Sequence, residues 1–148
     1  MLILVNGLVN NLNQHITMKL ESKKTIIPKS AKETFTFLSD VKNFEQLMPE
    51  NISKFEVLGE DKFLFALKGM PEIVLKKKEA LPNTKIILGA AGGKLDFSLT
   101  AYILELTEDT SEVQLKFEGE FNAMMGMMIK GPINKFIETL ATNLPQKV

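Results

Sequence analysis

Near its C-terminus the chain changes from a two-residue hydrophobic period to a helical one. Over residues 112–121 apolar and polar side chains alternate strictly, which is typical of a strand with one buried and one hydrated face. Farther along, apolar residues recur at the spacing of a helix stripe: Ile133, Phe136, Ile137, Leu140, Ala141 and Leu144. The apolar face of the sheet needs a cover, and the long C-terminal helix can supply it.

Strand-like segments separated by short turns precede residues 112–121. They span residues 52–58, 63–67, 72–81, 85–90 and 94–107. Six consecutive strands with short turns predict an antiparallel meander. In the longest segment Leu104 and Leu106 leave the face shared by the apolar residues before them, which predicts a bulge. Gly92-Gly93 predicts a hinge or tight turn.

The N-terminal part of the pattern combines one strand with two short helices. Residues 19–28 are typical of a strand, and the capping box Ser30-Ala-Lys-Glu33 predicts a helix start. A second short helical segment begins at Asp40, and Pro49 ends it. The predicted fold class is therefore α+β, with about seven antiparallel strands, two short helices after the first strand and a long C-terminal helix.

A methionine-rich segment lies just before the helix stripe. It contains Met124, Met125, Met127 and Met128, and Gly131-Pro132 follows it. The glycine-proline pair predicts either a kink or the start of a new helix. Because methionine is flexible and polarizable, the cluster suits the mouth of an apolar pocket. Ordinary core filling and contact with a partner chain also explain it, so these alternatives stay open.

The composition excludes several kinds of site. The chain has 148 residues, which suits one domain, and it contains one histidine (His15), no cysteine and no arginine. Thiol nucleophiles, thiolate metal sites and multi-histidine sites are therefore excluded within one chain. The formal charge of zero argues against a nucleic-acid partner. We predict no catalytic residue, no metal site and no cofactor. The basic run Lys76-Lys-Lys78 is typical of a solvated face, with contact to an anionic membrane surface as the alternative.

Residues 1–17 precede the regular pattern, which starts at Met18-Lys19. The apolar run from Met1 to Val5 is far shorter than the ~20 residues needed to span a bilayer. A secretory signal would also need a basic flank and a longer apolar stretch. We therefore expect a cytoplasmic protein with a single domain over residues 18–148. The extension over residues 1–17 is either dispensable or an added edge strand or oligomer contact, and His15 within it is assigned no catalytic role.

The order of elements resembles the helix-grip, or START-like, superfamily (SRPBCC), which includes the Bet v 1 pollen proteins and polyketide cyclases. The resemblance runs from Met18 to the C-terminus and rests on loose motifs. Ser30-Ala-Lys-Glu-Thr-Phe-Thr-Phe-Leu-Ser-Asp40 is similar to the first helix of bacterial members, and Phe44-Glu-Gln-Leu-Met-Pro49 is similar to the helix that follows. With Gly92-Gly93, these motifs look most similar to the branch named after carbon monoxide dehydrogenase, and a polyketide cyclase-like branch is the other candidate.

The resemblance implies a curved sheet wrapped around the C-terminal helix, with an apolar cavity between them. It also implies binding or transport of a small hydrophobic ligand (a lipid, quinone or polyketide-like molecule), although a minority of such proteins catalyse cyclisation or hydration. The absence of cysteine and of a histidine within residues 18–148 leads us to expect binding without catalysis here. The side chains expected to line the cavity are Phe37, Met48, Phe65, Phe97, Phe117, Phe121, Met124, Met128 and Phe136. Plain core packing is the alternative role for the phenylalanines.

An empty cavity of this kind would be costly. At ~24 cal/mol per Å3, about 300 Å3 of empty apolar space costs about 7 kcal/mol, comparable with the ~5–15 kcal/mol stability of a whole domain. Side chains therefore collapse into the space, or a ligand fills it. A cyclase or hydratase acting on a hydrophobic substrate, and an interaction module using the Met-rich segment, remain alternative functions. The protein is expected to be a monomer or a homodimer.

Overall fold

The computed structural model describes residues 15–91 and 96–148. The described elements are β1 (His15–Glu21), β2 (Thr25–Ile27), α2 (Ala31–Ser39), the 3-10 helix η1 (Val41–Leu47), β3 (Ile52–Val57), β4 (Lys62–Leu67), β5 (Ile73–Leu81), β6 (Lys85–Ala90), β7 (Asp96–Thr107), β8 (Thr110–Asn122) and α3 (Ala123–Lys147). The predicted order of elements is confirmed. One difference is that the first predicted strand is divided into β1 and β2.

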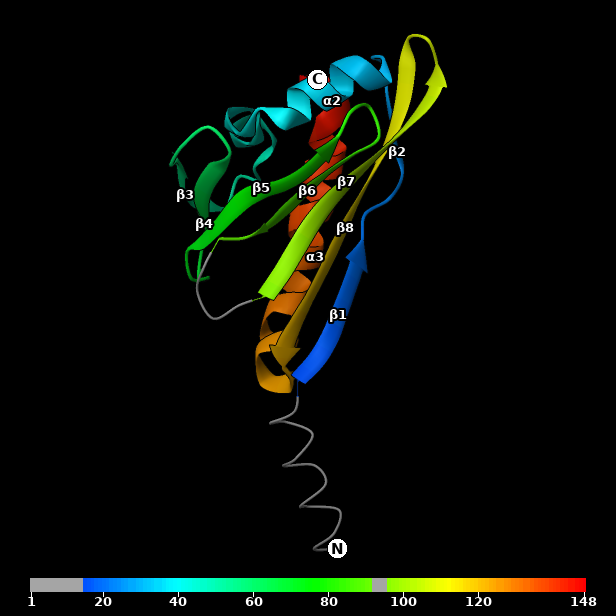
Figure 1. Ribbon diagram of the computed structural model, residues 1–148. Coiled ribbons are helices and arrows are strands. Elements are labelled where there is room, and N and C mark those ends of the chain that lie inside the picture. The colour runs from blue at the N-terminus through cyan, green and yellow to red at the C-terminus, as the bar shows by residue number, and fades with distance from the viewer. Residues whose placement is uncertain (1–14, 92–95) are drawn as a thin grey trace, which may run out of the picture.

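All eight described strands form one antiparallel sheet in the order β1-β8-β7-β6-β5-β4-β3, with β2 also paired to β8. Because β1 and β2 pair with successive parts of β8, they share one position at the edge of the sheet. The expected α+β helix-grip architecture is therefore present. Helix α3 lies along one face of the sheet, and α2 lies across the end where α3 finishes (Figure 1).

Ser22 explains why the first strand is divided. Its backbone N–H donates to the Leu115 carbonyl at 2.8 Å, while its side-chain oxygen accepts from the Leu115 N–H at 2.9 Å. The hydroxyl therefore takes the place of a backbone acceptor in the ladder. Pairing with β8 resumes at Thr25 with the register shifted by one residue, which is the geometry of a bulge.

The two longest strands present their predicted inner faces to α3. In β7 the buried apolar residues alternate up to Ile103, and Leu104 and Leu106 are exposed. The register of β7 with β8 shifts between Glu105 and Thr107, so the predicted irregularity is confirmed in this region. The predicted Gly92-Gly93 turn and the apolar run from Met1 to Val5 lie outside the described residues.

Helix α3 begins upstream of the glycine-proline pair. Asn122 caps it by accepting from the Met125 N–H at 2.7 Å, and Pro132 lies inside the helix. The Met-rich segment therefore forms the first turns of α3, and no new helix starts at Pro132. Because proline has no N–H, the carbonyl of Met128 lacks its helical partner; both residues are exposed, so water can satisfy that oxygen.

The first described strand bears on the predicted domain boundary. β1 begins at His15, which pairs with Asn122, so residues 15–17 belong to a strand of the sheet. Whether residues 1–17 as a whole are dispensable stays a prediction. Within residues 15–91 and 96–148, no helix has the length and apolar character needed to cross a membrane.

A buried pair of hydroxyls ties α2 to the sheet. Thr34 Oγ1 lies 2.9 Å from Ser111 Oγ, and Ser111 donates to the carbonyl of Lys29 at 3.0 Å. Because a serine has one hydroxyl hydrogen, the bond to Lys29 makes Thr34 the donor within the pair. Both side chains are fully buried, so no water can replace the hydrogen bond between the two hydroxyls. The bond to the carbonyl of Lys29 is partly buried.

Ser111→Ala is expected to lower the free energy of unfolding by about 1–3 kcal/mol, because the buried Thr34 hydroxyl and the partly buried Lys29 carbonyl lose their partner. Chemical denaturation measures this loss, and Thr142→Ala on the exposed face of α3 is the control. The free energy of unfolding of the double variant Thr34→Val with Ser111→Ala should fall by less than the sum of the losses in the two single variants. Strictly additive losses would contradict a direct interaction between the two hydroxyls.

Candidate ligand-binding site

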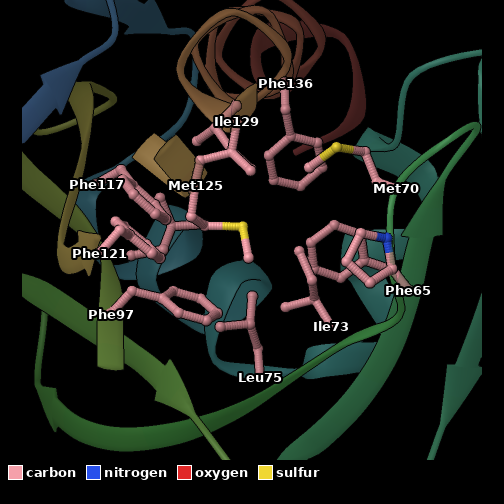
Figure 2. Close-up of a pocket in the computed structure, with 13 residues that line it drawn as sticks. Phe65, Met70, Ile73, Leu75, Phe97, Phe117, Phe121, Met125, Ile129 and Phe136 are labelled. Carbon is pink, nitrogen blue, oxygen red and sulfur yellow. The ribbon is translucent and has the colours of Figure 1, made fainter. Parts of the chain in front are cut away.

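A small apolar cavity lies between α3 and the inner face of the sheet (Figure 2). Strands β4, β5, β7 and β8, the turn between β4 and β5, and the first half of α3 supply its walls. Its 13 lining residues are all apolar: Phe65, Met70, Pro71, Ile73, Leu75, Phe97, Leu99, Phe117, Phe121, Met125, Ile129, Ile133 and Phe136. Such a surface can hold hydrocarbon or aromatic groups by shape and burial, and none of the described residues that line it has a polar side chain.

Two groups of aromatic rings face each other across the cavity. On one side Phe65 stacks on Phe136 with ring centroids 4.9 Å apart. On the other side Phe117 stacks on Phe97 at 5.5 Å and on Phe121 at 6.1 Å. Figure 2 shows the Met125 side chain projecting between these two groups, with its sulfur towards the middle of the cavity. The methionine therefore occupies the space that the rings enclose.

Gly119 allows the rings of β7 and β8 to lie where they do. It pairs with Phe97 across the two strands. A Cβ atom at this position would lie 2.6 Å from Phe97 Cβ, 2.9 Å from Phe121 Cε2 and 3.0 Å from the Asp96 carbonyl oxygen. Two of these atoms are backbone or adjacent to it, so they cannot move aside cheaply.

Gly119→Ala is therefore expected to lower the free energy of unfolding by about 1–3 kcal/mol, the usual effect of overpacking a core. Gly59→Ala is the matched control, because a Cβ there meets no atom within 4 Å. Urea denaturation of both variants measures the difference. Equal stability of the two variants would show that the inner face accommodates a side chain at position 119.

The cavity is nearly filled by its own side chains. Its volume is about 30 Å3, about the space of one water molecule. At ~24 cal/mol per Å3, this empty space costs about 0.7 kcal/mol, a small fraction of a domain's stability. Of the two outcomes expected from the sequence, the structure therefore shows collapse of side chains into the pocket.

A larger groove of about 600 Å3 lies outside the cavity, between the β4–β5 turn and the first turns of α3. Its lining residues are Asn51, Leu67, Lys68, Gly69, Met70, Pro71, Met125, Met128, Ile129, Gly131, Pro132 and Lys135. Met70, Pro71, Met125 and Ile129 belong to both linings. These four residues form the boundary between groove and cavity. The turn itself depends on Gly69, whose φ of +83° is one that other residues rarely adopt.

The structure brings five of the nine residues expected at the site together around the cavity: Phe65, Phe97, Phe117, Phe121 and Phe136. Met128 lines the outer groove instead and is 67% exposed. Met124 is 58% exposed and lines neither space, because its neighbour Met125 takes the inward position on α3. Phe37 and Met48 are partly buried against the core on α2 and at the end of η1, outside both linings.

Ile129 was missed from the sequence, and Met125 was named only as a member of the methionine cluster and not among the expected lining residues, although a signal for both was present. Counting back from Ile133 at four-residue steps gives Ile129 and then Met125, so the helix stripe extends upstream of Gly131-Pro132. Because Gly131-Pro132 was interpreted as a kink or the start of a new helix, this extension of the stripe was not predicted. The start of α3 at Ala123 sets the helical phase and turns Met125, rather than Met124 or Met128, towards the sheet.

The charged groups lie outside the cavity. In the predicted basic run, Lys77 Nζ donates to the Ser39 carbonyl at the end of α2 at 2.9 Å, while Lys76 and Lys78 are exposed. Lys77 therefore satisfies the last turn of a helix rather than reaching the cavity. The described parts of the chain contain no group of three or more carboxylates or histidines that could hold a metal ion.

Comparison with known proteins shows the fold of the chain. No protein-family model matches the chain, and no curated protein matches it. Norcoclaurine synthase from Thalictrum flavum, in complex with dopamine and hydroxybenzaldehyde, aligns with a TM-score of 0.68 at 14% identity, over 95% of this chain and 90% of that one. A START superfamily protein from Mycobacterium smegmatis aligns with a TM-score of 0.67 at 18% identity, over 91% and 97%.

A third solved structure is similar over part of its length. The di-domain ARO/CYC protein BexL aligns with a TM-score of 0.58 at 13% identity, over 85% of this chain and 46% of that one. At these identities the likeness concerns the backbone fold and not the chemistry of the site. The chain therefore has the helix-grip fold of START-like and Bet v 1-like proteins.

Proposed function

We propose that the protein binds a small hydrophobic ligand between the sheet and α3, without catalysis. The observation that carries this proposal is that the apolar cavity lies next to the open groove, with Met70, Pro71, Met125 and Ile129 lining both. A concave apolar site with an opening to solvent is the usual form of a small-molecule site. The ligand would enter between the β4–β5 turn and the first turns of α3.

Binding requires the cavity to open, because about 30 Å3 is too small for a ligand. Met70 and Met125 are partly buried at the boundary, and an unbranched methionine side chain can turn into the groove more easily than a ring can. Each CH2 group that the ligand then buries contributes about 0.8 kcal/mol. Burial of a chain of several carbons can therefore offset the free-energy cost of displacing one or two methionine side chains.

The cavity supports binding better than the enzymatic alternative. A cyclase or hydratase needs an acid or base beside the reacting atoms, and the described lining residues of the cavity carry none. The remaining alternative, an interaction module, is supported by the 58%, 74% and 67% exposure of Met124, Met127 and Met128. The cytoplasmic location, the membrane contact and the branch named after carbon monoxide dehydrogenase stay predictions.

Titration of the purified full-length protein with the neutral dye N-phenyl-1-naphthylamine tests the proposal. The expected result is saturable fluorescence enhancement that 1-dodecanol displaces, together with a rise in Tm as the alcohol binds the folded state. Mass spectrometry of an organic extract of the protein identifies any molecule that copurifies. Absence of dye binding, of stabilisation and of a copurifying lipophile would refute the proposed function.

A further inference from the structure

The rim of the groove carries positive charge from both of its walls. Lys68 comes from the β4–β5 turn and Lys135 from α3, and both line the groove. The other described lining residues are apolar or uncharged, so no carboxylate of the described residues belongs to this lining. An apolar groove with cationic groups and no anionic group is complementary to a negatively charged head on an apolar chain.

The acidic residues nearest in sequence to Lys68, Lys135 and Asn51 have other partners or lie outside the groove lining. Glu72, four residues after Lys68, pairs with Lys54 at 3.1 Å. Glu138, one helical turn after Lys135, accepts from the Lys23 backbone N–H at 2.9 Å, so it serves the segment between β1 and β2. Glu50 is exposed beside Asn51 and does not line the groove. Among the described residues, neither Lys68 nor Lys135 takes part in an ion pair.

Because the lysines line the groove and the cavity beyond it is apolar, the charged end and the apolar end of a ligand would bind in different places. The shared residues Met70 and Met125 lead inward to a surface with no polar side chain, where a carboxylate would lose its hydration without compensation. In the groove, the same carboxylate stays partly hydrated and meets lysine ammonium groups. The alkyl stems of the lysines can meanwhile cover the apolar chain as it passes.

From this arrangement we infer that the ligand is a single-chain amphiphile with an anionic head, such as a fatty-acid carboxylate. Its chain enters the cavity between Met70 and Met125, and its head remains in the groove against Lys68 and Lys135. Asn51, at the same rim, offers a further amide donor. The inference rests on the proposed function and adds the chemical class of the ligand.

Three probes with the same alkyl chain and different heads test the inference on the full-length protein: dodecanoate, 1-dodecanol and dodecyltrimethylammonium. Displacement of N-phenyl-1-naphthylamine gives each affinity. Dodecanoate is expected to bind about tenfold more tightly than 1-dodecanol, in line with charge-assisted contacts, and the cation most weakly. The preference for dodecanoate should shrink as salt is raised, because the groove is open to solvent.

Lys68→Gln with Lys135→Gln supplies the decisive variant. It should abolish the preference for dodecanoate over 1-dodecanol, with a much larger loss of affinity for dodecanoate than for 1-dodecanol. Lys130→Gln is the matched control, since Lys130 is an exposed lysine of α3 outside the groove lining. Circular dichroism verifies that all variants keep the fold.

The possible failures are distinguishable. If 1-dodecanol binds and dodecanoate binds no better, or if the double variant keeps the preference, the inference is overturned while the proposed function stands. If no alkyl probe binds, the proposed function itself fails. Sedimentation with lipid vesicles tests the membrane alternative. If the protein sediments with phosphatidylglycerol vesicles but not with phosphatidylcholine vesicles, and dodecanoate does not reduce this binding, the lysines would be assigned to a membrane surface. That result would also overturn the inference.

Discussion

Phe136→Ala is expected to lower the free energy of unfolding by about 3–5 kcal/mol, the largest effect of a single change at this site. The Phe136 ring is buried on α3 and stacks on Phe65 of β4 at 4.9 Å with an angle of 6° between the planes. It therefore connects the helix to the part of the sheet farthest from β1. Truncation removes this contact and leaves empty space that rigid strands cannot close.

Thermal and urea denaturation measure this effect. At about 2–4 °C per kcal/mol for a chain of this size class, Tm should fall by roughly 6–20 °C. Asn134→Ala, at an exposed position of the same helix, is the control and should change stability little. A loss below about 1 kcal/mol for Phe136→Ala would mean that α3 and the sheet close on the vacated space.

Met125→Ala is expected to raise the affinity for N-phenyl-1-naphthylamine about tenfold, which corresponds to about 1.4 kcal/mol. The Met125 side chain projects between the two aromatic groups, so its removal creates the space that a ligand otherwise has to open. Apolar cavities made in this way stay dry and accept apolar molecules. The same change should lower the free energy of unfolding by about 1–3 kcal/mol, since the side chain is only partly buried.

Met127→Ala is the matched control for this experiment. It removes the same side chain two residues away on the same helix, but Met127 is 74% exposed and lines neither the cavity nor the groove. The control should bind the dye as the unmodified protein does. If Met127→Ala changed the affinity as much as Met125→Ala, the dye would be bound by the exposed methionines, and the cavity would lose its support as the binding site.

The elements and their order were predictable from the sequence because they depend on local periodicity. Strict alternation over residues 112–121 matches β8, whose inner face is buried, and the capping box matches the start of α2. The stripe from Ile133 to Leu144 is buried on α3 as expected. The start of α3 was less predictable, because Gly131-Pro132 is a local breaking signal, whereas the packing of the first turns of α3 against the sheet depends on residues distant in the chain.

The site was predictable in part for the same reason. Its strand residues Phe65, Phe97 and Phe117 follow from alternation, which decides the face of a sheet without knowledge of distant contacts. Phe37 and Met48 were expected there and lie elsewhere, since α2 packs on β6, β7 and β8 across the end of the sheet where α3 finishes, and η1 packs on α3 (Figure 1). No local pattern indicates which end of a long helix a short helix will cover.

The sequence by itself determined the α+β class, the succession of elements and the apolar inner face, because periods of two and 3.6 residues are properties of neighbouring positions. The tertiary structure alone decided that the cavity is about 30 Å3 rather than open, since volume depends on rotamers and on the spacing between helix and sheet. It also decided that Lys68 and Lys135 line one groove. Residues so far apart in the chain meet only when the helix packs across the strands.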